Sequence, residues 1–576
     1  FYASLADKGQ SQYAGARATS RTVAALVTGD VRAAFGVLAA AAALVLVVTC
    51  GNVGGLLLLQ ASGRRRELAL RAALGASRAT LLRTLAARHA VLALAGGAVG
   101  LLVAIFAVRT FARMAPREFP RVEDLAVDWR LFAALTVVTA LVVLVVGVGS
   151  ALSATRVSPA AVLGGAPLGA GGTPRDVRAR RLLVGGQVAL ALVVLSAASL
   201  VGRSLANLTT LDLGIAAPDR LAFVELIPSA GWDDASGATV DPASRRARWD
   251  ALQDEILTRV AAIPGVVGVA PVVHEAYAGS AGWDARLEAV GASANDSTRR
   301  PYLNMEITNE DYLRVTGGTL VRGRWITRGD RDGSDRIIVL SDGAARSLFP
   351  SEDPIGRRVR LWGDVTATVV GLVRDTRFRD HREARASFYL PHRQFDGAAP
   401  FLAVRTDADP AGVVMAIRQV MSGLAPGIVV QDHGTLQTRL AEPLARPRLL
   451  AAVLGGFATV VVLLALAGVY TIVAGSVAAR RREFGVRSAL GATPQRLLAL
   501  VMGEGGRIAA LGASVGVLVS LWGGRLLESL LYGVVPTDPV TLGVSTVAVL
   551  LLCALAVAPS AWRAAVVDPA RELRGE

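Results

Sequence analysis

The chain has 576 residues, is 53% hydrophobic with a mean hydropathy of +0.47, and carries a formal charge of +15. Soluble globular domains rarely combine so apolar a composition with so much charge, so these values favour a membrane protein. Arginine supplies almost all of the positive charge, because Lys8 is the only lysine, and nucleic acid is therefore not expected as a partner.

Seven uncharged stretches are candidate membrane spans, since a helix needs about 20 apolar residues to cross a bilayer. In chain order they cover residues 33–63, 89–108, 131–155, 182–202, 449–479, 508–524 and 539–562. None of them contains Asp, Glu, Lys or Arg, which argues against an ion-coupled carrier. Their polar residues Asn52 and Gln187 are expected to hydrogen-bond between helices, with a transport site as the alternative.

Arginine-rich loops set the orientation of these spans, because positively charged loops remain in the cytoplasm. The loop at 64–88 has seven arginines and one acid, the loop at 156–181 has five and one, and the loop at 480–507 has six and two. These three loops and the C-terminal residues are therefore predicted to be cytoplasmic. The polar block at 204–447 and the short loops at 109–130 and 525–538 are predicted to lie outside.

A three-span module occurs twice, at an offset of 416 residues. "RRRELALRAALGAS" at 64–77 and "RRREFGVRSALGAT" at 480–493 share nine of fourteen residues, and each follows a stretch of 31 uncharged residues. Such a stretch spans about 46 Å as a helix, whereas the hydrocarbon core is about 30 Å thick, so part of each helix should extend beyond the membrane as a stalk. Both copies also have glycines at the four-residue spacing that allows close helix packing, namely Gly96, Gly100, Gly512 and Gly516.

The repeated phrase is predicted to form a short helix at the membrane surface, a turn, and a new helix along the cytoplasmic face. Glu67 and Arg71 are four apart on the short helix, and Gly75 suits its end. In the second copy, Thr493 suits the N-cap of the next helix. Two interpretations stay open from the residues alone. The arginines can anchor the helix to anionic headgroups, whereas the acid that recurs as Glu67 and Glu483 suits a docking surface for a cytoplasmic partner.

The polar block alternates strands and helices and is predicted to be an α+β domain. Residues 244–273 and 401–432 each contain a helix, a Pro-Gly break and a strand, the pattern of the split βαβ units in ferredoxin-like domains. Between them, 336–350 is predicted to be a strand entering a helix capped by Ser341, and 365–373 another strand.

No catalytic or metal site is predicted. "DRDGSD" at 330–335 lacks the glutamate and the glycine position of a calcium loop and is expected to be a solvated hairpin turn. The histidines show no metal-ligand spacing, and Cys50 and Cys553 both lie in apolar runs, so no disulfide framework is expected. "GASVG" at 512–516 fits a serine-nucleophile pattern, but Ala98 stands in the place of Ser514 in the other copy.

The sequence also contains no nucleotide-binding loop. A P-loop needs a lysine before its Ser or Thr, and the only lysine lies in "DKGQ". We therefore expect any ATP-driven action to depend on another polypeptide, and we predict neither an enzyme activity nor a cofactor for this one.

Three features together resemble the MacB/FtsX-type ABC permease family, in the branch whose chains carry two fused permease units. They are the two modules with a long first span followed by R-R-R-E-x-x-x-R-x-A-L-G-A-[ST], the single span at 182–202 before an outer α+β domain, and "IVLSDGAARSLFPSEDPIGRRVRL" at 338–361. The resemblance covers nearly the whole chain. It implies a membrane α-helical fold of about seven transmembrane helices in two FtsX-like modules, with an α+β extracytoplasmic domain like the MacB periplasmic core.

The resemblance also predicts domain boundaries. Residues 1–32 correspond to the tail of an extracytoplasmic domain whose remainder is absent, 33–165 to the first FtsX-like module, and 166–181 to a cytoplasmic linker. Residues 182–203 correspond to the single span of the second unit, 204–447 to the periplasmic core domain, and 448–576 to the second FtsX-like module.

In permeases of this family the cytoplasmic loop after the long span meets a separate ATPase. The resemblance therefore shifts the interpretation of the repeated phrase from anchoring toward docking. The implied docking residues are Arg64, Arg66, Glu67, Arg71 and Gly75 in the first copy and Arg480, Arg482, Glu483, Arg487 and Gly491 in the second.

The expected function is that of a permease subunit that couples a separate P-loop ATPase to the periplasmic domain by mechanotransmission and exports drugs, lipids or lipoproteins. The expected location is the bacterial inner membrane, with the lipid bilayer, the ATPase and a periplasmic adaptor or hydrolase as partners. Two alternatives remain. One is an FtsX-like scaffold that regulates a cell-wall hydrolase without transport, and the other is an orphan permease without an ATPase.

Overall fold

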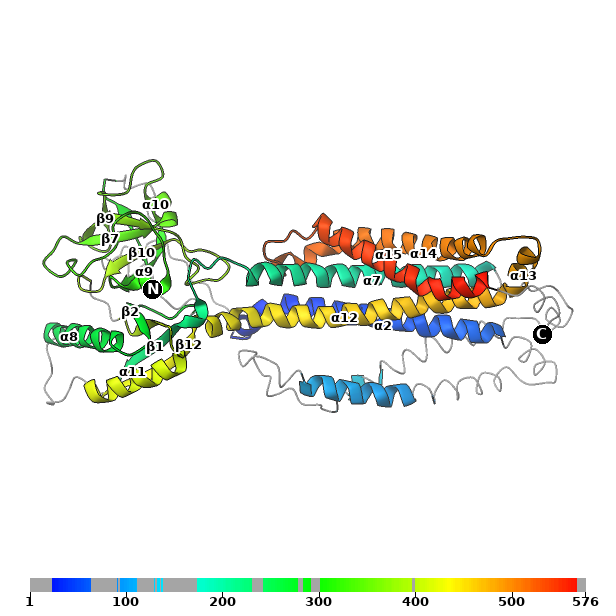
Figure 1. Ribbon diagram of the computed structural model, residues 1–576, viewed down its shortest axis with the longest axis horizontal. Helices are drawn as coiled ribbons and strands as arrows, with labels where there is room; N and C mark the ends of the chain where they lie inside the picture. Colours follow the sequence, from blue (N-terminus) through cyan, green and yellow to red (C-terminus); the bar gives the residue numbers. More distant parts are fainter. Residues whose placement is uncertain are drawn as a thin grey trace. The chain divides into compact units, whose positions relative to one another are not determined.

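A computed structural model describes residues 23–63, 91, 94–110, 129, 132–134, 136–137, 174–229, 242–277, 283–291, 301–395 and 399–566. The chain divides into two compact units (Figure 1). Unit 1 comprises Phe1–Leu205 and Pro447–Glu576, and unit 2 comprises Ala206–Arg446. The chain therefore leaves unit 1, forms unit 2, and returns to unit 1.

Five helices among the described residues are long and apolar enough to cross a membrane. They are α2 (Val23–Gly63), α7 (Pro174–Thr209), α12 (Leu436–Ala479), α14 (Pro494–Gly523), which continues into the 3-10 helix η5 (Gly524–Leu530), and α15 (Pro539–Ala565). A shorter apolar helix, Leu94–Thr110, overlaps the second predicted span. The predicted span at 131–155 lies largely outside the described residues, so the count of seven stays a prediction.

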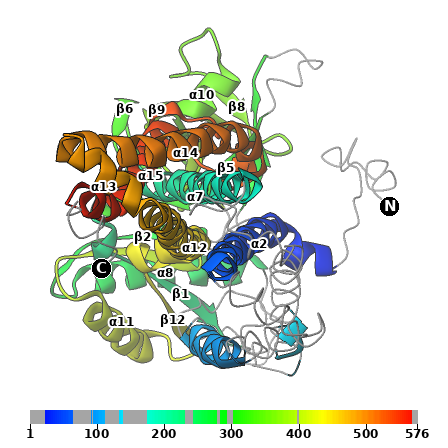
Figure 2. The same ribbon diagram turned by 90° about the vertical axis from the view of Figure 1, so that its right-hand side faces the viewer.

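Helix α7 packs into two different apolar cores of unit 1. Its buried Val188 belongs to a cluster with α12, α14 and α15, whereas its buried Ala191 and Val194 belong to a cluster with α2 and α12. Figure 2 looks along these helices and shows α7 between α12 and the α14–α15 pair, with α2 beside α12. Helix α7, which contains the single predicted span at 182–202, is therefore central to the described part of the bundle in unit 1.

Both first helices of the repeat are longer than a bilayer requires. Helix α2 has 41 residues and α12 has 44, whereas about 20 are enough to span the hydrocarbon core. Helix α12 begins at Leu436, well before the uncharged stretch begins at residue 449. The predicted excess length is confirmed.

The helix after the repeated phrase differs from the prediction. A separate helix along the cytoplasmic face was expected before the span at 508–524, but α14 is one helix from Pro494 to Gly523 that covers both. Its residues Arg496, Glu504 and Arg507 are charged, and counting only uncharged residues placed the start of the span too late. A helix of 30 residues accommodates a polar first part and an apolar second part without a break.

Unit 2 contains a four-stranded antiparallel sheet with the order β12-β1-β11-β2. A short 3-10 helix, η3 (Pro218–Arg220), precedes the first strand of this sheet. The elements of this subdomain follow one another in the order βαββαβ. Its two helices pack on the sheet through a buried apolar cluster. The elements are β1 (Leu221–Pro228), α8 (Pro242–Ala261), β2 (Val266–Val272), β11 (Phe401–Thr406), α11 (Pro410–Leu424) and β12 (Ile428–Thr435). The predicted split βαβ arrangement of a ferredoxin-like domain is confirmed.

A second sheet is inserted between β2 and β11. It has eight strands in the order β3-β5-β10-β7-β9-β8-β4, with β6 paired to β9, and the β5–β10 and β7–β9 pairs are parallel. Its elements are β3 (Asp284–Arg286), β4 (Glu288–Ala289), β5 (Tyr302–Thr308), α9 (Tyr312–Thr316), β6 (Leu320–Gly323), β7 (Ile337–Ser341), α10 (Asp342–Leu348), β8 (Arg358–Arg360), β9 (Thr366–Val373) and β10 (Ser387–Pro391). Ser341 caps α10 by accepting from the Ala344 N–H, as predicted.

The segment "DRDGSD" is a turn whose residues 331–335 are exposed, as predicted, but it does not connect the two strands of a hairpin. The strands on either side of it, β6 and β7, both pair with β9 and not with each other. Asp330 is buried and accepts two hydrogen bonds of 2.8 Å from Arg324, and its carboxylate also accepts from the Thr327 N–H. This acid therefore stabilises the connection between two strands.

Candidate functional site

The second copy of the repeated phrase forms the bend after α12 and the short helix α13 (Arg481–Ala489). Gly491 follows with a φ of +92°, a left-handed conformation that favours glycine and terminates the helix. Thr493 then caps α14, because its side chain accepts a hydrogen bond from the Arg496 N–H. The N-cap predicted at Thr493 is confirmed.

An alternating chain of arginines and glutamates joins α13 to its neighbours. Arg480 donates to both carboxylate oxygens of Glu483, at 2.7 and 3.0 Å, and Arg487 pairs with Glu483 at 2.6 Å. Arg480 also donates to Glu504 of α14 at 3.1 Å, and Arg181 of α7 donates to the other Glu504 oxygen at 2.6 Å. We call Arg181, Arg480, Glu483, Arg487 and Glu504 the arginine–glutamate junction.

A buried aromatic ring fixes α13 from the other side. Phe484 is 1% exposed and belongs to the apolar cluster of α7, α12, α14 and α15. The guanidinium carbon of Arg480 lies 5.3 Å from the centre of this ring, within range of a cation–π interaction. Helix α13 is therefore attached to the bundle by both an apolar and an ionic contact.

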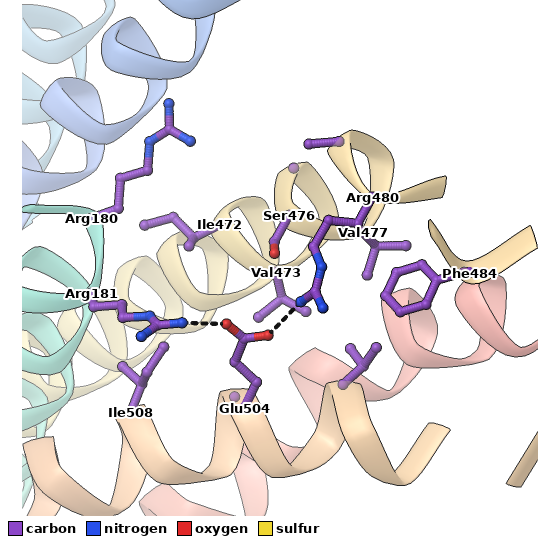
Figure 3. A pocket seen from close by; sticks show the side chains of 14 residues that line it. Arg180, Arg181, Ile472, Val473, Ser476, Val477, Arg480, Phe484, Glu504 and Ile508 are labelled. Carbon is purple, nitrogen blue, oxygen red and sulfur yellow. Dashed lines mark hydrogen bonds and ion pairs between the residues drawn. The ribbon is translucent and has the colours of Figure 1, made fainter. Parts of the chain in front are cut away.

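A cavity of about 200 Å³ lies at the arginine–glutamate junction. Figure 3 shows Glu504 between Arg181 and Arg480 at this cavity, with apolar side chains such as Ile472 and Ile508 on the other walls. The cavity thus has a charged side and an apolar side, both contributed by unit 1.

The hydrogen bonds of the junction favour its ionised state. The bond from Arg480 lowers the pKa of the Glu483 carboxyl, and the same bond raises the pKa of the Arg480 guanidinium. A carboxylate and a guanidinium that stabilise each other stay charged at neutral pH. The surface around α13 therefore carries fixed charges of both signs.

One face of α13 is open. Val486 lies in α13 and Leu490 is the C-cap residue, whose N–H donates to the Val486 carbonyl at 3.0 Å, and the two side chains are 41% and 83% exposed. Arg487 lies next to Val486 and is also exposed. Exposed apolar side chains beside charges are compatible both with contact to another protein and with insertion at the membrane surface.

The predicted docking residues of the two copies are described to different extents. Of the second copy, Arg480, Glu483 and Arg487 are joined in the junction, Gly491 ends α13, and Arg482 lies within α13. The first-copy residues lie outside the described residues, and they are Arg64, Arg66, Glu67, Arg71 and Gly75.

The predicted helix-packing glycines also differ between the copies. A Cβ at Gly512 would lie 3.0 Å from the Val188 Cβ and would collide with the Gly185 carbonyl, and a Cβ at Gly516 would lie 2.9 Å from the Ala189 carbonyl. Helix α14 therefore approaches the backbone of α7 closely at both glycines. At Gly96 and Gly100, nothing in the described part of the chain lies within 4 Å of such a Cβ.

Two residues of the junction were missed by sequence reasoning. Arg181 and Glu504 are 323 residues apart, and no local pattern links them. The available signal was that Glu504 is one of two acids among the arginines of the loop at 480–507, close to the uncharged stretch that begins at residue 508.

The arrangement has the features of a binding surface. Among the described residues, no group of three or more His, Cys, Asp or Glu side chains is placed to hold a metal ion. What the site offers is paired charge, exposed apolar surface and a rigid attachment to four helices.

Two family models match the chain. The MacB-like periplasmic core domain matches residues 188–420, and the FtsX-like permease C-terminal domain matches twice, at residues 39–159 and 455–569. The two FtsX-like matches contain the two copies of the repeated phrase, and the MacB-like match contains most of unit 2.

Several curated proteins are similar to parts of the chain. A macrolide export ATP-binding/permease protein MacB from Hahella chejuensis is 26% identical over 335 residues, covering 56% of this chain and 47% of its own length. An uncharacterized ABC transporter permease, YknZ of Bacillus subtilis, is 26% identical over 260 residues, covering 42% of this chain and 64% of its own length. The chain thus spans less than two thirds of the length of either relative.

Two solved structures, from a MacB protein and from YknZ, are also similar to part of the chain. The periplasmic region of MacB from Actinobacillus actinomycetemcomitans matches with 17% identity and a TM-score of 0.27, covering 39% of this chain and 92% of its own. The extracellular domain of YknZ matches with 15% identity and a TM-score of 0.26, covering 37% of this chain and 100% of its own. The two family models together match most of the chain, and the chain belongs to the MacB/FtsX-type ABC permease family, as a multi-pass inner-membrane protein with an extracytoplasmic MacB-like domain.

Proposed function

We propose that the chain is the permease part of an export system driven by a separate cytoplasmic ATPase, which docks on α13 and its counterpart in the first module. The observation that carries this proposal is the open face of α13. Val486 and Leu490 are exposed there, on a helix that the arginine–glutamate junction and Phe484 hold firmly. A membrane anchor alone gives no reason to fix the charges of such a helix.

The fixed attachment of α13 suits the transmission of force. A push on α13 reaches α12 through the Arg480 bend, α14 through Glu504, and α7 through Arg181. Helix α12 then runs as one helix from Ala479 back to Leu436, with Pro443 and Pro447 near its far end, so a displacement at Ala479 is passed along most of its length. By this mechanism the ATPase would act on the extracytoplasmic domain without a substrate path through the bilayer.

The direction of transport and the substrate class are also proposals. Relatives named for macrolide export support export, and the long helices support mechanical coupling to a domain outside the membrane. Amphipathic compounds such as drugs, lipids or lipoproteins are the substrate class that fits this arrangement. A periplasmic adaptor protein would complete the export route.

The docking proposal can be tested with charge placed on the open face. The full-length parent, purified from its native membrane in mild detergent, should retain an ATPase that is identified by its nucleotide-binding loop. The Leu490→Asp and Val486→Asp variants should each retain at least tenfold less ATPase than the parent, because a carboxylate buried in the interface without a partner opposes binding.

The matched control is Met415→Asp, which introduces the same charge at an exposed position, 67% accessible, on α11 of unit 2. It should retain the ATPase at the parental level. If the parent and all variants bring down no ATPase while remaining folded, the docking role is wrong and the orphan permease becomes the better account.

A further inference from the structure

The cavity at the arginine–glutamate junction lies where three helices change from charged to uncharged sequence. Arg181 of α7 directly precedes the uncharged stretch at 182–202, and Arg480 directly follows the stretch at 449–479 at the end of α12. On α14 the uncharged stretch begins at Ile508, which itself lines the cavity. Because charged side chains are excluded from the hydrocarbon core, this boundary marks the depth of the lipid headgroups.

The arginine-rich loops assign this boundary to the cytoplasmic leaflet. The cavity adjoins the loops at 156–181 and 480–507, which are predicted to be cytoplasmic from their excess of arginine. Anionic phospholipids give the cytoplasmic surface of a membrane its negative potential, and basic pockets between helices on that side bind their headgroups. The cavity is therefore within reach of such a headgroup.

The charged wall of the cavity is rich in arginine. The residues that line it include three arginines, Arg180, Arg181 and Arg480, and one glutamate, Glu504. Arg181 and Arg480 share the Glu504 carboxylate, one at each oxygen. The Arg181 side chain is 53% exposed and donates only one of its N–H groups to Glu504, so its other N–H groups can bind a second anion. A phosphate suits this place, since guanidinium groups bind phosphate oxygens with strong charge-assisted hydrogen bonds.

A hydroxyl and an apolar wall complete the cavity. Figure 3 shows the Ser476 side chain pointing from α12 into the cavity, on the side of Arg480 and Glu504. Ile472 of α12 and Ile508 of α14 contribute to the apolar wall. A free phosphate ion would use only the charged wall, whereas a phospholipid has a polar and an apolar part and would use both. The combination therefore favours a lipid over a soluble anion.

The size of the cavity determines which part of a lipid it holds. Its volume of about 200 Å³ corresponds to roughly six water molecules at their volume in the liquid. That space accommodates a phosphodiester group and part of the glycerol. The acyl chains do not fit, so they stay in the bilayer.

We propose that this cavity binds the phosphate headgroup of one anionic phospholipid from the cytoplasmic leaflet. The phosphate accepts hydrogen bonds from Arg181 and from the Ser476 hydroxyl, and the glycerol lies against Ile472 and Ile508. The bound lipid thereby joins α7, α12 and α14 at the level of α13. Its affinity depends on the charge of the headgroup.

This inference does not depend on the docking of an ATPase. It concerns a cavity between the helices, whereas docking is proposed for the open face of α13. Its test measures bound lipid and uses neither ATPase retention nor transport, so the two proposals can fail separately.

The test is native mass spectrometry of the full chain, purified in mild detergent and freed of lipid. The probes are a phosphatidylglycerol, a phosphatidylcholine with the same acyl chains, and inorganic phosphate. We expect one phosphatidylglycerol per chain, bound at least about tenfold more tightly than phosphatidylcholine, because the headgroup charge faces arginine. Inorganic phosphate at the same concentration should not displace it.

Two variants change the cavity in different ways, and each has a matched control. Arg181→Gln should weaken phosphatidylglycerol binding about fivefold by removing one charge, whereas Arg178→Gln removes the same charge from an exposed α7 residue that does not line the cavity. Ser476→Leu should abolish the one-lipid complex by filling the cavity without changing its charge. Ala478→Leu adds the same volume at an exposed α12 residue outside the cavity. Both controls should bind lipid as the parent does.

Three results would overturn the proposal. Equal binding of the two lipids would show that headgroup charge is not recognised, and displacement by inorganic phosphate would assign the cavity to a soluble anion. Variants that bind like their controls would show that the lipid lies elsewhere on the helices. If Ser476→Leu does not fold, the comparison of Arg181→Gln with Arg178→Gln decides, because loss of one bond from a half-exposed network costs little stability.

Discussion

Two arginine–glutamate contacts in this molecule differ in burial: one is enclosed in the protein interior and the other is partly exposed to solvent. In unit 2, Arg379 donates to Glu306 at 3.0 Å, and the two side chains are 3% and 2% exposed. In unit 1, Glu483 and Glu504 of the arginine–glutamate junction have side chains that are 40% and 35% exposed. Burial raises the pKa of the Glu306 carboxyl against the effect of Arg379, whereas the bond from Arg480 lowers the pKa of Glu483.

The difference shows what each contact is able to do. A buried pair cannot exchange partners, because each charge would be left without a counterion in an apolar interior. In a half-exposed network, replacing one ion pair by a hydrogen bond to water or to another protein costs little free energy. The buried pair therefore suits a fixed connection within unit 2, and the junction suits a surface that binds and releases a partner.

Breaking the buried pair should have the largest effect. Arg379→Ala leaves the Glu306 carboxyl and its bond to the Val273 N–H inside unit 2, and removal of one partner of a buried pair costs about 3–5 kcal/mol. Pulse proteolysis of the full chain in increasing urea should show a large drop in the unfolding midpoint of unit 2. As a control, Arg322→Ala removes a partner of Asp353 from an ion pair that is 55% and 56% exposed, and it should cost about 0–1 kcal/mol.

Overpacking the contact of α14 with α7 should have the next largest effect. Gly516→Val places its Cβ against the Ala189 carbonyl, and forcing extra volume into a packed contact costs about 1–3 kcal/mol. Thermal unfolding in detergent should show a lower Tm. In contrast, Gly506→Ala adds a methyl group where nothing lies within 4 Å among the described residues. Its Tm should be unchanged or higher, since alanine favours a helix, and a Tm as low as that of Gly516→Val would contradict the packing explanation.

Neutralising the central carboxylate of the junction should affect binding more than stability. Glu504→Gln weakens the bonds to Arg181 and Arg480, but a half-exposed network contributes only about 0–1 kcal/mol. We expect a Tm close to that of the parent and a several-fold loss of ATPase retention. Equal retention in the variant and the parent would show that the junction does not position α13 for docking.

The smallest effect should be a dependence on pH. Because the pKa of folded Glu483 lies below its ordinary value of 4.5, its contribution is fully present above that value and is lost as the pH falls through the lowered pKa. The expected size is about 0.5 kcal/mol, as for other exposed helix pairs. Tm measured between about pH 3 and pH 6 should decline more in the parent than in Glu483→Gln, and parallel curves would contradict this assignment.

Local chemistry accounts for what could be predicted. Thr493 as an N-cap and Ser341 as the cap of α10 both follow from contacts within four residues, which the sequence displays directly. The pair of Glu483 and Arg487 has the four-residue spacing noted for Glu67 and Arg71 in the first copy. The split βαβ units were also predictable, because each is a continuous segment with its own periodicity. Asn52 was expected to hydrogen-bond between helices, and its bond to the Leu464 carbonyl confirms this.

Contacts between distant segments account for what could not be predicted. The bond from Arg181 to Glu504 joins residues 323 apart, and the insertion of one sheet between β2 and β11 of the other leaves no local signal. The start of α14 was misplaced because charged residues are compatible with a helix that leaves the membrane. The residues of the first repeated phrase lie outside the described residues, so their docking role stays a prediction.

The central claim is that the open face of α13 binds an ATPase, and photo-cross-linking at Leu490 tests it most directly. A photoreactive amino acid placed at this position in the full chain, irradiated in native membranes, should form one major adduct with a protein that carries a nucleotide-binding loop. The same residue placed at Met415 should not form that adduct. If the Leu490 adduct contains only lipid while the protein is folded, α13 is a membrane anchor and the docking account is wrong.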